Sequence, residues 1–159
     1  MNIEIEKKFL VKNDSFKNES VREIRIMQRY LASVPERSVR IRIAGEKGFI
    51  TIKGIANDSG ISRFEWEKEI SVIDANELFT ICEPGVIDKM RYIVKKRQHT
   101  FEIDEFYGEN EGLVIAEIEL SSEEETFIIP DWLGEEITGN VKYYNSMLRK
   151  NPFSKWNNS

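Results

Sequence analysis

The chain has 159 residues and a formal net charge of −5, with 40% hydrophobic and 32% charged residues. This composition excludes a disordered chain. No apolar run approaches the ~20 residues of a membrane helix, and the negative charge disfavours nucleic acid as a partner. The single cysteine, Cys82, excludes an internal disulfide and suits a reducing compartment. We therefore expect one cytoplasmic domain over residues 1–159, with no membrane and no nucleic-acid partner.

Most of the chain alternates between apolar and polar residues, which is the pattern of strands with one buried face. The first strand is predicted at EIEKKFLV, residues 4–11, and later segments are joined by short links such as GEKG and NDSG that favour hairpin turns. Consecutive strands with short links pair antiparallel. The other predicted strands cover residues 25–34, 37–45, 48–55, 62–72, 85–97, 99–108 and 112–121.

Helical patterns interrupt the strands in two places. In residues 74–85, Asp74 is the expected N-cap, and the Pro-Gly pair at residues 84–85 is the expected stop. Residues 140–152 form the second predicted helix, which ends on basic residues as helix C-termini prefer. The segment PDWLGEEITG, residues 130–139, reads as an irregular link. The predicted fold class is mainly β (α+β), with an antiparallel sheet and flanking helices.

The polar face of the sheet is almost wholly ionic, and its charges are sorted by strand. An open sheet with a solvated face gives the same alternation, but such a face normally includes Ser, Thr and Gln. In a closed barrel with this face inward, the ions would need partners, and a polyphosphate with a divalent metal would supply them. The cations are Arg40, Arg42, Lys53, Lys89 and Arg91, and the acids are Asp104, Glu117 and Glu119.

The opening strand carries the most specific motif. Its sequence EIEKK places Glu4, Glu6 and Lys8 on one face, and it resembles the Glu-x-Glu-x-Lys signature of the CYTH superfamily, also called triphosphate tunnel metalloenzymes. The likeness is greatest to short bacterial members that act as inorganic triphosphatases. It continues in order through VRIR (39–42), TIK (51–53), RFEWEKEI (63–70), KMRY (89–92), FEIDEFYG (101–108) and AEIEL (116–120).

The resemblance implies a closed eight-stranded antiparallel β barrel, a tunnel with a charged lumen. It implies metal-dependent hydrolysis of inorganic triphosphate to pyrophosphate and phosphate, with Mg²⁺ or Mn²⁺ as cofactor. Glu4, Glu6, Lys8 and Lys89 are the expected catalytic residues. The expected triphosphate contacts are Lys8, Arg40, Arg42, Lys53, Arg63, Lys89 and Arg91. The expected metal ligands are Glu4, Glu6, Glu67, Asp104, Glu117 and Glu119.

Other functions within the same superfamily stay open. Class IV adenylate cyclases and triphosphatases acting on ATP or thiamine triphosphate use a similar tunnel, so a nucleoside triphosphate is an alternative partner. The cyclases carry a His-Phe pair well before the Ile-Arg-x-Arg strand, whereas here the single histidine, His99, lies downstream and precedes Thr100. A non-catalytic polyphosphate-binding module is the third alternative, although anion binding alone needs cations more than acids. The chain could also form a homodimer.

Overall fold

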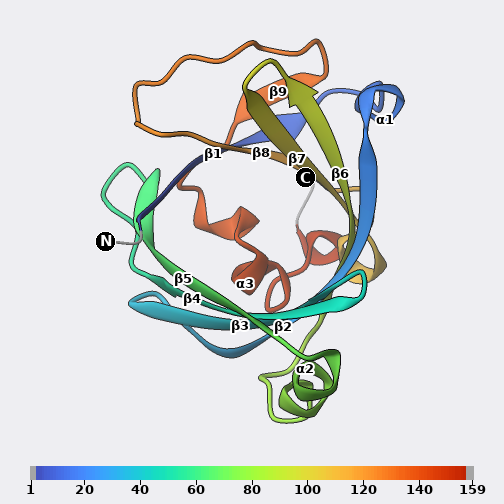
Figure 1. The fold of residues 1–159 in the computed structure, drawn as a ribbon, viewed down its shortest axis with the longest axis vertical. Helices are drawn as coiled ribbons and strands as arrows, with labels where there is room; N and C mark the ends of the chain where they lie inside the picture. Colours follow the sequence, from blue (N-terminus) through green and yellow to red (C-terminus); the bar gives the residue numbers. More distant parts are fainter. Residues whose placement is uncertain (1–2, 157–159) are drawn as a thin grey trace.

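The computed structural model describes residues 3–156, and within that range nine β-strands form one antiparallel sheet (Figure 1). The strands are β1 (Ile3–Val11), β2 (Arg22–Val34), β3 (Arg37–Ala44), β4 (Lys47–Gly54), β5 (Ser62–Ile70), β6 (Ile87–Lys96), β7 (His99–Phe106), β8 (Val114–Glu119) and β9 (Leu133–Glu136). The helices are α1 (Phe16–Glu19), α2 (Val72–Phe79) and α3 (Asn145–Leu148), with 3₁₀ turns η1 (Gly108–Asn110), η2 (Val141–Tyr143) and η3 (Phe153–Lys155). None of the helices in residues 3–156 has the length and apolar character needed to cross a membrane.

The sheet closes on itself. Its order is β5-β4-β3-β2-β6-β7-β8-β1, and β1 then pairs with β5, so the strands form a closed ring. Figure 1 looks down this ring and shows α3 within its outline. The closed eight-stranded barrel implied by the resemblance is therefore confirmed, and the alternative of an open, solvated sheet is wrong.

One edge of β1 is shared by two partners. Residues Ile3–Ile5 pair with β5, and farther along the strand Phe9 and Val11 pair with β9. The prediction of an irregular link over residues 130–139 was wrong, because this segment contains β9. The four-residue strand has no apolar alternation of its own. It forms because β1 offers backbone donors and acceptors where β5 no longer covers them.

The helical predictions were correct in place but not in extent. Helix α2 begins at Val72 because Ser71, which follows β5, is the true N-cap and accepts a hydrogen bond from the Asp74 N–H at 2.9 Å. The helix ends at Phe79, before the Pro-Gly pair. The predicted helix over residues 140–152 is divided into η2 and α3, because Tyr144 between them is extended (ψ 137°).

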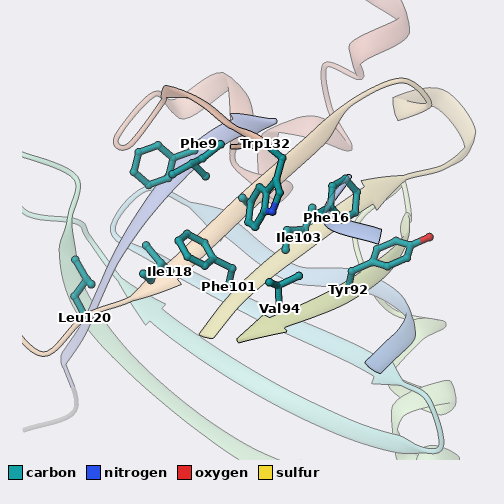
Figure 2. Packing of buried hydrophobic residues seen from close by; sticks show 11 residues of the cluster. Phe9, Phe16, Tyr92, Val94, Phe101, Ile103, Ile118, Leu120 and Trp132 are labelled. Atoms are coloured by element: carbon teal, nitrogen blue, oxygen red, sulfur yellow. The ribbon is translucent and has the colours of Figure 1, made fainter. Parts of the chain in front are cut away.

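The main hydrophobic core lies outside the ring of strands. Outward-facing side chains of β1, β6, β7 and β8 are covered there by α1 and by the segment that leads from β8 to β9 (Figure 2). Trp132 is fully buried and makes edge-to-face contacts with Phe101 (ring centroids 5.2 Å apart) and Phe16 (6.0 Å). The segment between β8 and β9 therefore stabilises the outer face of the barrel.

A second apolar cluster closes one end of the lumen. Ile87, Phe106 and Ile115 lie two residues from ionic side chains of β6, β7 and β8, so they share the inner face of their strands. Leu148 of α3 and Ile137 complete this cluster, which contains buried side chains only from apolar residues. The lumen is thus ionic along most of its length and apolar at the end where α3 enters.

Two glycines fix the turn that leads into η2. Gly60 and Gly139 both have positive φ, and a Cβ on Gly60 would lie 2.4 Å from the Gly139 Cα. We expect Gly60→Ala to lower the free energy of unfolding by roughly 2–3 kcal/mol. Alanine is strained at this positive φ, and the backbone at Gly139 must also move to make room for the Cβ. Gly108→Ala is the matched control, since φ is also positive there but nothing lies within 4 Å of the added Cβ.

Urea denaturation of both variants measures the difference. The Gly108 variant should lose only about 1 kcal/mol, the cost of the backbone conformation alone. Equal losses in the two variants would show that the contact between the two loops has no energetic importance.

Candidate active site

The barrel encloses a cavity of about 640 Å³. Its wall comes from all eight barrel strands, β1 to β8, and residues 144–147 of the chain cover part of it. Every site residue predicted from the sequence lines this cavity except Asp104, which is buried against Lys89 and Arg91 as described below. The predicted residues that line it are Glu4, Glu6, Lys8, Arg40, Arg42, Lys53, Arg63, Glu67, Lys89, Arg91, Glu117 and Glu119.

Acidic side chains gather where β1 pairs with β8. The register sets Glu6 opposite Glu119 and Lys8 opposite Glu117. Burial, and then the charge of Glu117, raise the pKa of Glu6 to about 7. Burial opposes the ionisation of Glu117, but the charges of Lys8 and Arg91 outweigh it and hold its pKa at about 2. Glu6 and Glu117 thus both lie near Lys8, but the surrounding cations lower the pKa of Glu117 alone.

A second ionic group joins the start of β1 to β4 and β5. The Lys53 ammonium lies 3.2 Å from carboxylate oxygens of both Glu4 and Glu65, and Arg63 Nε lies 3.9 Å from Glu4. Burial, followed by the hydrogen bond with Glu65, raises the pKa of Glu4. Burial and the charge of Glu4 raise the pKa of Glu119 as well. This end of the cavity therefore holds the carboxylates of Glu4, Glu65 and Glu119 beside the cations of Lys53 and Arg63.

The arginines of β3 share one carboxylate. Guanidinium nitrogens of Arg40 and Arg42 lie 3.5 and 3.4 Å from Oε2 of Glu67, which also accepts a 2.7 Å hydrogen bond from Thr51. Thr51 is fully buried, and its hydroxyl accepts a hydrogen bond from Arg40. Each of these side chains faces inward because strand residues two apart share a face. Glu67 thus holds both arginines in place, and their guanidinium groups line the cavity.

Asp104 is the carboxylate that holds the two cations of β6, Lys89 and Arg91. It is 1% exposed and binds Arg91 through two parallel bonds of 2.8 and 2.9 Å, while the Lys89 ammonium lies 2.7 Å from it. The charges of Arg91 and Lys89 outweigh burial and lower the pKa of Asp104. Burial lowers the pKa of Lys89 to about 8. Asp104 thus holds two cations against the cavity.

Several cavity residues were not identified in the sequence. Tyr144 lies against Lys8 and Arg63, with its ring centroid 4.9 Å from the Lys8 Nζ and 5.5 Å from the Arg63 Cζ. Asn145 accepts a hydrogen bond from Lys89. Both belong to the short segment that was predicted as one amphipathic helix. The resemblance to the CYTH superfamily includes YYN (143–145), but no role was predicted for either side chain, and only the fold shows that both line the cavity.

The acidic group fits a hard divalent cation by its chemistry. Glu4, Glu6 and Glu119 offer oxygen donors, and burial is the main cause that raises their pKa values. A cation bound among them would favour the ionised form of each. Within residues 3–156, no three acidic, histidine or cysteine side chains already converge into a complete metal site. Mg²⁺ commonly takes only one or two protein carboxylates and fills its shell with water and substrate phosphates. The donor set suits such an ion.

Comparisons with known proteins identify the family. A model of the CYTH domain matches residues 2–150. The chain is 47% identical to an inorganic triphosphatase of Acetivibrio thermocellus over 157 residues, which cover 98% of this chain and 99% of the relative. It is 34% identical to an inorganic triphosphatase of Nitrosomonas europaea over 149 residues, which cover 91% and 95%.

A solved structure agrees with the sequence comparisons. The crystal structure of an inorganic triphosphatase aligns with a TM-score of 0.66 at 31% identity, over 94% of this chain and 95% of that chain. The likeness thus extends through the barrel strands and the segments that line the cavity. The chain belongs to the CYTH domain family.

Proposed function

We propose that the protein hydrolyses inorganic triphosphate to pyrophosphate and phosphate. The observation that carries this proposal is the convergence of basic side chains from β1, β3, β4, β5 and β6 on one cavity that is also lined by the carboxylates of Glu4, Glu6 and Glu119. Basic groups alone would suit anion binding, whereas the acids suit a metal-assisted reaction. The activities of the relatives in A. thermocellus and N. europaea support the same substrate.

The cations bind and orient the substrate. Lys8, Arg40, Arg42, Lys53, Arg63, Lys89 and Arg91 are the proposed contacts to phosphate oxygens. Arginine suits this role because its planar donors meet two oxygens at once. These positive groups stabilise the charge that moves to the leaving pyrophosphate, and in phosphoryl transfer such positioning and electrostatics supply most of the catalysis.

The carboxylates of the cavity differ in their surroundings. Glu67, Asp104 and Glu117 are ion-paired to cations of β1, β3 and β6, which they hold in place. Glu4 also has ion-pair partners, Lys53 and Arg63, and Glu6 lies 4.0 Å from Lys8. Glu4, Glu6 and Glu119 are the proposed direct ligands of Mg²⁺ or Mn²⁺. When bound, this ion polarises the phosphoryl group and acidifies water. Glu4 and Glu6 orient the attacking water by accepting its hydrogen bonds.

A substrate panel tests the proposal. With Mg²⁺ or Mn²⁺, we expect phosphate release from tripolyphosphate to exceed release from ATP or thiamine triphosphate, because residues 144–147 and the apolar cluster close one end of the cavity. Chelation of the metal should abolish the reaction. Phosphate and cyclic AMP are measured in parallel. Formation of cyclic AMP from ATP would indicate a cyclase, and binding without any product would indicate a polyphosphate-binding module.

A further inference from the structure

The Lys89 ammonium is held from two sides. It lies 2.7 Å from Asp104 Oδ2 and donates to Asn145 Oδ1 at 2.9 Å. An ammonium has three N–H donors, so these contacts leave one donor. Lys89 is 1% exposed and still lines the cavity. The remaining donor can therefore reach a phosphate oxygen only if the other two keep the side chain in this position.

Asn145 is itself fixed by the barrel. Its Oδ1 also accepts a 3.1 Å hydrogen bond from Nε2 of Gln28, a fully buried residue of β2. The Gln28 amide in turn donates to the Tyr30 hydroxyl at 3.2 Å. Asn145 thus joins α3 to β2 and β6, and one oxygen atom serves both donors.

The end of α3 is anchored independently of Lys89. Arg149, directly after α3, donates to Ser33 Oγ at 2.6 Å and to the Pro84 carbonyl at 2.8 Å, and it also binds the Glu83 carboxylate. Leu148 is fully buried in the apolar cluster at the closed end. These contacts fix the segment that carries Asn145, so its oxygen is already in place before a ligand arrives.

We propose that Asn145 is a positioning residue that directs the Lys89 ammonium toward the substrate. This inference rests on the proposed triphosphatase function. Asp104 alone does not direct Lys89, because its carboxylate is shared with Arg91 and is buried. Asn145 supplies a second, uncharged acceptor on another side of the ammonium. It therefore orients Lys89 without adding negative charge that would repel a phosphate.

The test measures binding of tripolyphosphate by calorimetry in the presence of a metal chelator. We expect Asn145→Ala to raise Kd by roughly tenfold, a size typical of coupled polar contacts. Asn145→Leu, which has a similar volume and maintains packing, should show the same loss. Asn151→Ala is the matched control, because Asn151 is exposed, follows the same segment and does not line the cavity.

A double-mutant cycle separates positioning from a general structural role. In a Lys89→Met background, Asn145→Ala should change Kd by less than about twofold, because its effect passes through Lys89. In a Lys53→Met background, the roughly tenfold loss should persist, since Lys53 is held by Glu4 and Glu65 instead.

Equal losses in all three backgrounds, or wild-type affinity in both Asn145 variants, would overturn the inference while leaving the proposed function intact. If the unaltered protein failed to bind tripolyphosphate under these conditions, the result would overturn this inference, and the phosphate-release assay with Mg²⁺ or Mn²⁺ would decide the proposed function separately.

Discussion

Replacement of Glu4 by glutamine is expected to abolish phosphate release from tripolyphosphate without unfolding the barrel. Glutamine keeps the shape of the side chain but removes its charge, so a divalent cation at this end of the cavity would lose a hard oxygen ligand. Losses of this kind reach at least about 10²–10³-fold in rate. Phosphate release is measured with saturating Mg²⁺ or Mn²⁺, and thermal denaturation reports folding.

Glu105→Gln is the matched control for this experiment. Glu105 also lies on a barrel strand and binds a lysine, Lys17 at 2.9 Å, but it does not line the cavity. This variant should retain wild-type activity. Full activity in Glu4→Gln would refute the assignment of Glu4 to the reaction.

Replacement of Trp132 by alanine is expected to cause the largest loss of stability. The indole is fully buried against Phe16 and Phe101 in the outer core, and its removal leaves a cavity that the surrounding strands cannot fill. A loss of about 3–5 kcal/mol in the free energy of unfolding follows from comparable truncations. Urea denaturation measures it.

Trp66→Ala provides the comparison for Trp132. Trp66 is 38% exposed on the outer face of β5, so its truncation should cost no more than about 1 kcal/mol. If the two variants were equally stable, the outer cluster would not be the main core of the protein.

The regular alternation predicted the strands and their ionic face, whereas the closed barrel was predicted from the resemblance to the CYTH superfamily. A one-residue shift would move a whole ionic row to the other face. One ionic residue in a strand, such as Glu4, Arg40 or Glu117, was therefore enough to identify the face of that strand that lines the lumen. The closing contact between β1 and β5 could not, since it joins residues such as Glu4 and Arg63 that are far apart in the chain.

The features that sequence reasoning missed depend on tertiary contacts. Strand β9 forms because β1 has a free edge, and its own residues carry no strand pattern. Asn145 meets Gln28 and Lys89 across 117 and 56 residues of chain. A lone amide within an amphipathic segment is typical of a solvated helix, so only the folded arrangement reveals its position.

Because the main core lies outside the barrel, the residues that stabilise the fold differ from those that line the cavity. Apolar residues such as Trp132 and Phe101 determine whether the chain folds, and they do not line the chamber that holds the ions. Charges in the chamber can consequently be exchanged while the scaffold persists, provided that buried partners such as Asp104 and Lys89 change together. An evolving lineage could retune the barrel for a different anion through its inward-facing positions alone.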